Sequence, residues 1–161
     1  MSDRKLLEII AENLLRKKET IAVAESVTSG LLMAEFSLAK NATAFFQGGL
    51  VAYNLGQKVR QLRVDPIHAD QTNSVSEEVA RQMAREVANS FCSQWGISIT
   101  GYAVPVQELQ IADCFAFFSF CYNGTEVLTE RIESPAKNQE HVQRIYIDHI
   151  LKVFAGKTGL T

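Results

Sequence analysis

The stretch Thr20-Ile21-Ala22-Val23-Ala24-Glu25-Ser26-Val27-Thr28-Ser29-Gly30 indicates the fold class of this chain. Its first five residues form a short apolar run, which is typical of a strand buried inside a sheet. The residues from Glu25 to Gly30 predict a turn, and a helix follows that begins near Gly30 or Leu31. A strand, a polar turn and a helix in this order indicate an α/β protein.

The same pattern continues on both sides of this segment. Helices are predicted for residues 3–18, from residue 30 or 31 onward, 55–62, from Ser74 onward and 138–154; the helix at Ser74 rests on a capping box, Ser74-x-x-Glu77, and Asp65-Pro66 predicts a turn. Strands are predicted for residues 20–24, 45–53, 96–100, 114–122 and 126–132. Asn123-Gly124 is a type I′ hairpin signal between the last two strands, which we therefore expect to be antiparallel.

These elements predict a three-layer α/β/α sandwich with a mixed, mostly parallel sheet and one antiparallel hairpin. With 161 residues and no linker or repeat, the chain is expected to form a single domain over residues 1–161. Two glycines, Gly48-Gly49, interrupt the second predicted strand. Glycine weakens a strand unless another group must approach its backbone closely.

Composition narrows the class of partner. The net charge of −2 gives no reason to expect a nucleic acid or a membrane surface as partner. No apolar run approaches the roughly 18 residues of a membrane span, and residues 1–5 lead into a helix without the apolar block of a signal peptide. Three cysteines stand in apolar runs, which predicts buried free thiols and a cytoplasmic location: Cys92, Cys114 and Cys121.

Common cofactor signatures are missing from the sequence. The three histidines, His68, His141 and His149, have no HExxH or CxxH spacing, so no metal site is expected. The sequence contains no GxGxxG or GxxxxGK[ST] motif, so no bound nucleotide cofactor is expected. A Ser-His-Asp triad stays open, although no GxSxG elbow supports it.

The first candidate for chemistry is Ser26, between a buried strand and the start of a helix. Backbone N–H groups are unpaired there and the helix dipole is positive, which suits an oxyanion or a phosphate. Ser26 is therefore a candidate nucleophile. On spacing alone, however, Ser26, Thr28 or Ser29 is more often simply the N-cap of the helix.

The second candidate is the segment from Gly48 to Lys58. Tyr53 ends the predicted strand, and Lys58 lies about one turn into the following helix, so both can face the same pocket. A buried lysine of lowered pKa, or a tyrosine beside a lysine, can take the proton of a serine without histidine. Taken alone, Tyr53 is more often an ordinary strand end and Lys58 a solvated helix residue.

Together these segments resemble the CinA C-terminal domain family, also known as the nicotinamide-nucleotide amidohydrolases. Its hallmark turn A-E-S-C-T-G-G-L-L corresponds here to Ala24-Glu25-Ser26-Val27-Thr28-Ser29-Gly30-Leu31-Leu32. Its segment G-G-x-V-A-Y-S-N-x-x-K corresponds to Gly48-Gly49-Leu50-Val51-Ala52-Tyr53-Asn54-Leu55-Gly56-Gln57-Lys58, and V-S-E-E-V-A is Val75 to Ala80. The order and spacing hold from about Leu6 to Phe154.

The resemblance implies a metal-free and cofactor-free hydrolysis of nicotinamide mononucleotide, or a related amide, to the acid and ammonia. It implies that Ser26 is the nucleophile and that Tyr53 and Lys58 activate it. It further implies a small-molecule substrate and a homo-oligomer. The residues it implies for substrate binding are Val27, Thr28, Ser29, Gly30, Gly48, Gly49, Thr100, Gly101 and Tyr102.

The sequence departs from the family pattern where a substrate would lie. The family loop T-G-x-A-G-P-x-G-G reads Thr100-Gly101-Tyr102-Ala103-Val104-Pro105-Val106 here, so Val104 replaces a glycine of the family pattern. Where the family has G-D-R at the start of its last helix, this chain has Ala136-Lys137-Asn138-Gln139, and Lys137 offers only a point charge for a phosphate. The alternative is therefore a catalytically impaired relative that serves as a ligand-binding or oligomerisation module. A loop that fills the pocket with its own side chains would favour this alternative.

Overall fold

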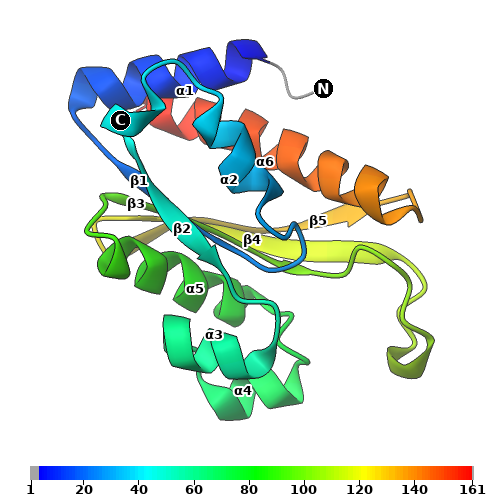
Figure 1. The fold of residues 1–161 in the computed structure, drawn as a ribbon. Coiled ribbons are helices and arrows are strands. Elements are labelled where there is room, and N and C mark those ends of the chain that lie inside the picture. Colours follow the sequence, from blue (N-terminus) through cyan, green and yellow to red (C-terminus); the bar gives the residue numbers. More distant parts are fainter. Residues whose placement is uncertain (1–3, 161) are drawn as a thin grey trace.

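The computed structural model describes residues 4–160 of the chain. Within this range, five strands form one sheet in the order β2-β1-β3-β4-β5. They are β1 (Ile21–Glu25), β2 (Phe46–Val51), β3 (Trp95–Gly101), β4 (Cys114–Tyr122) and β5 (Thr125–Ser134). Helices cover both faces of the sheet (Figure 1). The predicted α/β fold with a mixed sheet is confirmed.

Four of the five strands of the sheet, β1, β2, β3 and β5, run in the same direction, as predicted, and β4 runs against them. β1 is parallel to β2 and to β3, whereas β4 is antiparallel to β3 as well as to β5. Two of the four pairings are therefore parallel. The reason is that no α-helix separates β3 from β4, and a parallel return would need a crossover connection of about a dozen or more residues, usually helical.

The helices form two layers. α1 (Arg4–Lys17), α2 (Leu31–Ser37) and α6 (Gln139–Leu160) lie on one face, and α3 (Leu55–Leu62), α4 (Pro66–Gln71) and α5 (Glu77–Ser90) lie on the other (Figure 1). Two short 3₁₀ helices are η1 (Ala42–Ala44) and η2 (Gln107–Leu109). Among residues 4–160, no helix has both the length and the apolar character that a bilayer crossing requires.

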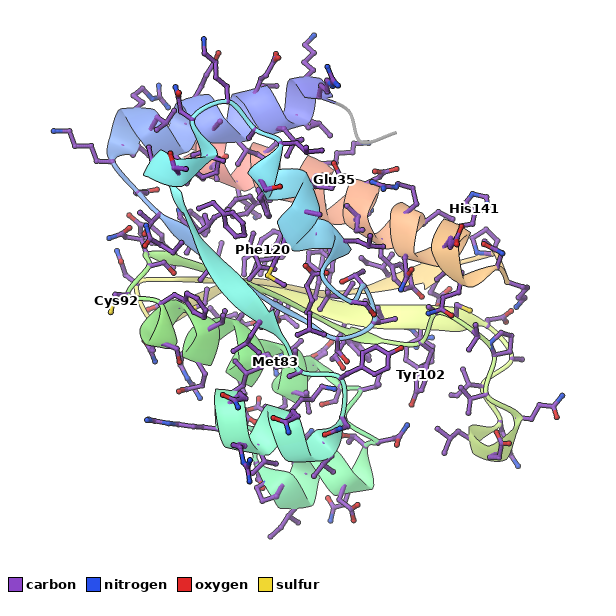
Figure 2. The ribbon with its side chains drawn as sticks, viewed as in Figure 1. Glu35, Met83, Cys92, Tyr102, Phe120 and His141 are labelled. Atoms are coloured by element: carbon purple, nitrogen blue, oxygen red, sulfur yellow. The ribbon has the colours of Figure 1, made fainter. Side chains whose placement is uncertain are left out.

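Each face of the sheet has its own apolar core. Phe120 of β4 is buried with Trp95 and Phe154 in the larger core, beneath α1, α2 and α6. Met83 of α5 belongs to a smaller core on the opposite face, with Ala22 and Val87. The labelled side chains of Phe120 and Met83 lie on the two sides of the sheet (Figure 2).

The aromatic strand β4 divides its side chains between these two faces. Phe118 and Phe120 are fully buried. Phe115 and Phe117 are only half-buried. Their rings lie edge to face, with the ring centres 5.9 Å apart. The guanidinium of Arg131 lies 4.1 Å from the Phe115 ring centre and covers part of this apolar surface.

Two helix starts differ from the sequence prediction. Asp65-Pro66 is not a free turn: Asp65 caps α4 by accepting a hydrogen bond from the Ile67 N–H, and Pro66 occupies the first helical turn. The cap of α5 is Ser76 rather than Ser74, because Ser76 Oγ accepts a hydrogen bond from the Val79 N–H at 3.1 Å. Ser74 has a left-handed backbone, with φ 60°, and precedes the helix.

The cysteines follow the prediction in part. Cys114 and Cys121 are buried free thiols, as expected. Cys92 is exposed, because it lies in the turn after α5, where its φ of 51° directs the chain away from the helix.

Candidate active site

The candidate site lies at the carboxyl ends of β1 and β3. The loop after β1 leads through α2 to β2, and the loop after β3 leads the opposite way to β4. Adjacent parallel strands whose connections diverge leave a crevice at their carboxyl ends, which is where open α/β sheets bind ligands. Ser26 follows β1 directly, and Thr100 and Gly101 end β3. All three line one cavity of about 420 Å³.

The turn that carries Ser26 is held by the buried carboxylate of Glu25. This carboxylate accepts hydrogen bonds from the Thr28 hydroxyl at 2.5 Å and from the N–H groups of Gly30, Leu32 and Met33 at 3.0, 3.1 and 2.7 Å. These donors lie at the positive end of α2, so they stabilise a buried negative charge. Glu25 therefore fixes the geometry of the turn and of the helix start together.

This arrangement excludes a capping role for the hydroxyl residues. Gly30 is the residue before α2, and no side chain at that position caps the helix. Thr28 is buried and donates to Glu25, and Ser29 Oγ only reaches the Ser26 carbonyl oxygen at 3.5 Å. The interpretation of Ser26, Thr28 or Ser29 as the N-cap of α2 is wrong. The carboxylate of Glu25, the residue before them, accepts the hydrogen bonds at the start of this helix instead. The sequence signal for this arrangement was an acidic residue, Glu25, close to the start of a predicted helix.

Ser26 and Lys58 meet, as the sequence predicts. Lys58 Nζ donates a hydrogen bond to Ser26 Oγ at 3.0 Å, and the lysine is only 3% exposed. Among residues 4–160 no carboxylate forms an ion pair with Lys58. Burial lowers the pKa of Lys58 to about 8, because the charged amine loses solvation and no carboxylate among the described residues compensates for it. At about pH 8 and above, a large fraction of this amine is neutral and able to accept a proton.

Helix α3 places this lysine. Asn54 caps α3 by accepting from the Gln57 N–H, and the Lys58 N–H donates to the Asn54 carbonyl oxygen at 3.1 Å. Lys58 therefore lies one turn after the start of the helix, as its spacing from Tyr53 indicates. The hydrophobic side of α3, with Leu62, packs towards the smaller core, and this directs Lys58 inward.

Tyr53 lines the same cavity but is not part of this contact. It is 61% exposed, and its hydroxyl has no hydrogen-bond partner among the residues that the structure describes. The structure thus brings Ser26 and Lys58 together and leaves Tyr53 at the edge of the cavity.

In the turn from Val27 to Gly30, only the N–H groups of the first half are candidate donors for an oxyanion. The Ser29 N–H donates to the Ser26 carbonyl oxygen and the Gly30 N–H donates to Glu25. Within residues 4–160, the N–H groups of Val27 and Thr28 have no acceptor. Val27 also lines the cavity, and its carbonyl oxygen accepts a hydrogen bond from Gln143 Nε2 at 2.8 Å. Of these two residues, Val27 is the one that lines the cavity.

Gly48 and Gly49 do not line this cavity. A Cβ on Gly49 would lie 1.9 Å from the Val23 carbonyl oxygen, so this glycine allows β2 to pair closely with β1. Gly48 has φ 111°, next to a register shift between the two strands. Both glycines have a structural function in the sheet.

The loop after β3, whose sequence departs from the family pattern, lines the cavity and does not fill it. Tyr102, Val104 and Val106 are all at its wall. Tyr102 is held from two sides, since its hydroxyl accepts from Asn73 Nδ2 at 3.1 Å and its carbonyl oxygen accepts from the Tyr146 hydroxyl at 2.9 Å. Its position below the sheet is visible in Figure 2. The volume left open matches the lower end of the roughly 300–1,000 Å³ found in small-molecule sites.

The segment between α4 and α5 forms another wall that the sequence did not indicate. Asn73 and Ser74 are consecutive residues with left-handed φ values of 51° and 60°, and both line the cavity. Such backbone is costly for residues other than glycine. It is held here by the Thr100 hydroxyl, which donates to the Ser74 carbonyl oxygen at 2.7 Å, and by the Asn73–Tyr102 contact.

Lys137 does not reach the cavity. Its amine forms an ion pair with Asp113 Oδ1 at 2.5 Å and donates to the Ala112 carbonyl oxygen. Among the described residues, no group of three His, Cys, Asp or Glu side chains is arranged as ligands for a metal ion.

A three-layer α/β domain with a serine–lysine pair at the switch point of its sheet is the class that these observations define. The family model of the CinA C-terminal domain matches residues 3–157. This chain therefore belongs to the CinA C-terminal domain family.

Individual relatives agree with this. The chain is 32% identical to a CinA-like protein of Prochlorococcus marinus over 149 residues, which are 91% of this chain and 34% of that protein. It is 38% identical to a CinA-like protein of Rippkaea orientalis over 103 residues, 64% of this chain and 25% of the relative. The chain thus spans about a third or less of the length of the curated relatives it matches.

Solved structures show the same fold. A competence or damage-inducible protein from Enterobacter asburiae superposes with a TM-score of 0.91 at 23% identity, covering 98% of this chain and 99% of that one. A CinA superfamily protein from Enterobacter cloacae gives a TM-score of 0.91 at 24% identity, covering 98% and 93%.

Proposed function

We propose that this domain is a serine amidohydrolase that hydrolyses a nicotinamide nucleotide or a related small amide to the acid and ammonia. The observation that carries the proposal is the 3.0 Å contact between Lys58 Nζ and Ser26 Oγ at the wall of an open cavity. A buried amine of lowered pKa is a competent general base for a serine hydroxyl.

The geometry supports an acyl-transfer sequence. Ser26 Oγ attacks the amide carbonyl carbon while its proton passes to the neutral Lys58 amine, and the carbonyl oxygen becomes an oxyanion near the Val27 N–H. The Lys58 ammonium then protonates the leaving nitrogen, the C–N bond breaks, and ammonia departs from an ester on Ser26. A water molecule attacks this ester and gives its proton to Lys58, and the acid leaves as Ser26 regains its hydrogen.

Three features support this sequence. Glu25 holds the Ser26 turn rigidly, which keeps the nucleophile aligned for attack. The unpaired N–H groups of Val27 and Thr28 cost no rearrangement when negative charge develops. Tyr53, which the family resemblance implicates, borders the cavity, where it can cover a bound substrate.

The test is ammonia release by the purified protein from nicotinamide mononucleotide and a panel of simpler pyridine carboxamides. We expect release with the native chain, a loss of at least about a thousandfold in Ser26→Ala, and no change in Ser90→Ala. Ser90 is the matched control because it is an exposed serine at the end of α5, away from the cavity. Equal rates from the Ser26→Ala and native proteins would refute the serine mechanism. No release from any amide would favour the ligand-binding module instead.

A further inference from the structure

Ser74 places a buried hydroxyl group at the wall of the candidate active site. Within the described part of the chain, four polar side chains at this wall are buried: Ser26, Lys58, Ser74 and Thr100. Ser26 and Lys58 are bonded to each other, and the Thr100 hydroxyl donates to the Ser74 carbonyl oxygen. Among residues 4–160, the Ser74 hydroxyl has no hydrogen-bond partner, although Ser74 is only 6% exposed. A buried hydroxyl without a partner is costly unless a ligand supplies one.

The backbone at Ser74 does not explain why a serine occupies this position. Its φ is 60°, a left-handed value that costs energy for any residue with a Cβ atom. The Ser74 N–H donates to the Ala69 carbonyl oxygen at 2.7 Å, and the Ser74 carbonyl oxygen accepts from Thr100 at 2.7 Å. Glycine would keep both bonds and adopt the same φ without strain. The hydroxyl has no capping function either, because Ser76 caps α5.

The sheet holds Ser74 close to the reacting hydroxyl. The Ser26 N–H donates to the Ile99 carbonyl oxygen at 3.1 Å, and Ser74 is bonded to the side chain of Thr100, the next residue of β3. Ser74 lies between α4 and α5, on the same face of the sheet as α3, which carries Lys58 (Figure 1). Since neighbouring strands are only about 4.8 Å apart, Ser74 borders the part of the cavity in which the amide would react.

The unpaired groups of the cavity complement a primary carboxamide. This group has an acceptor oxygen and two N–H donors. The Val27 N–H, which has no acceptor among residues 4–160, can donate to the oxygen. The nitrogen needs an acceptor, and the other buried side chains at the wall are already engaged with each other or with backbone. The hydroxyl oxygen of Ser74 can fill this role.

We infer that the Ser74 hydroxyl binds the carboxamide nitrogen of the substrate and selects amides over groups of the same shape that lack an N–H. The inference rests on the proposed amidohydrolase function for the choice of ligand. Ser74 is thus a specificity-determining residue of this chain. Its strained backbone is retained because it directs the hydroxyl into the cavity.

A matched pair of ligands tests this contact: nicotinamide mononucleotide and 3-acetylpyridine mononucleotide, in which a methyl group replaces the NH2 group. Calorimetry on the Ser26→Ala protein gives both dissociation constants without turnover. Addition of Ser74→Ala should weaken the binding of nicotinamide mononucleotide about tenfold, as one lost hydrogen bond implies, and change that of the acetyl compound by less than about twofold.

Two glycine variants separate the hydroxyl from the backbone. Ser74→Gly removes the hydroxyl and relieves the left-handed strain. We expect an equal or higher melting temperature together with a loss of about tenfold in affinity, and in kcat/KM for ammonia release from the active protein. Cys92→Gly is the matched control, because Cys92 has φ 51°, is exposed and does not line the cavity. It should bind both compounds as before and release ammonia at the native rate.

Three outcomes overturn the inference: unchanged binding of nicotinamide mononucleotide in Ser74→Ala, an equal loss for both compounds, or no binding of either compound to the Ser26→Ala protein. An equal loss would indicate that Ser74 contacts the ring or the sugar instead. The proposed function fails separately. The expected binding pattern without ammonia from the active protein would support the Ser74 contact and reject the hydrolase. Ammonia release that Ser74→Ala leaves unchanged would support the hydrolase and reject the contact.

Discussion

Lys58 Nζ and Ser26 Oγ lie 3.0 Å apart although 32 positions separate the two residues in the chain. Burial holds the pKa of Lys58 at about 8. The neutral amine is the active form of a base, so the reaction should accelerate as pH rises.

The first prediction concerns this pH dependence. We expect kcat/KM for amide hydrolysis to increase about tenfold per pH unit below pH 8 and to level off above it. Lys58→Arg should abolish the activity, because a guanidinium stays protonated throughout this range. A rate that is flat between pH 6 and 9 in the native protein would contradict the assignment of Lys58 as base.

Lys58 should also reduce the stability of the fold. Its pKa falls from 10.5 to about 8 on folding, so the unfolded chain binds more protons and the penalty is complete below pH 8. We expect Lys58→Met to raise the free energy of unfolding at pH 7, by at most about 3 kcal/mol. The gain should shrink as pH rises from about 8 to 10.5. Urea denaturation at several pH values measures this, and a gain that grows with pH would show the sign to be wrong.

The two residues that the family resemblance pairs with Ser26 should differ in importance. Lys58→Met removes the base and should lower kcat by about a hundredfold or more. Tyr53→Phe removes a hydroxyl that has no partner among the described residues, and we expect less than a tenfold effect on kcat/KM. Steady-state kinetics on both variants gives the ranking. A loss in Tyr53→Phe as large as in Lys58→Met would place the phenol in the proton transfer.

Glu25 should be essential for the turn. Glu25→Ala leaves the N–H groups of Gly30, Leu32 and Met33, which are buried or partly buried, without an acceptor, and we expect a loss of about 3 kcal/mol or more in the free energy of unfolding. Glu25→Gln keeps one acceptor oxygen and should lose less. Chemical denaturation compares the two; a loss below about 1 kcal/mol in Glu25→Ala would show that water replaces the carboxylate.

The two glycines at positions 49 and 156 should respond in opposite directions to alanine. A Cβ on Gly49 would collide with the Val23 backbone at 1.9 Å, so Gly49→Ala should destabilise the sheet severely. Gly156 lies in α6 with open space around it, and Gly156→Ala should stabilise the chain by up to about 1 kcal/mol. Thermal unfolding of both variants is the measurement. Similar melting temperatures for the two would contradict the close pairing of β1 and β2.

Local signals in the sequence predicted most of the fold. The apolar run before Glu25 and the Asn123-Gly124 turn each depend on neighbouring residues alone, and both were interpreted correctly. The capping box at Ser74 failed because Asn73 and Ser74 adopt left-handed backbone, which contacts with Thr100 and Tyr102 stabilise. Those contacts join distant segments and leave no local pattern.

In the candidate site, too, some features were predictable from local sequence and others depended on tertiary contacts. The spacing from Tyr53 to Lys58 placed the lysine on α3, and its contact with Ser26 was expected. Two features depended on tertiary contacts alone: the pairing of Lys137 with Asp113, and a loop at Tyr102 that borders the cavity without closing it. The role of Glu25 had a local signal, but its four donors could be counted only in the folded chain.

The anchoring of Ser26 through Glu25 and Gln143 has a consequence for how this domain can change. Both anchors act on the turn from behind, and neither of them borders the cavity. Replacement of the wall residues Asp70, Tyr102 or Val104 can therefore alter which compound is accepted while the reacting hydroxyl keeps its place. A redesign of selectivity should begin at those three positions and leave the rear supports intact.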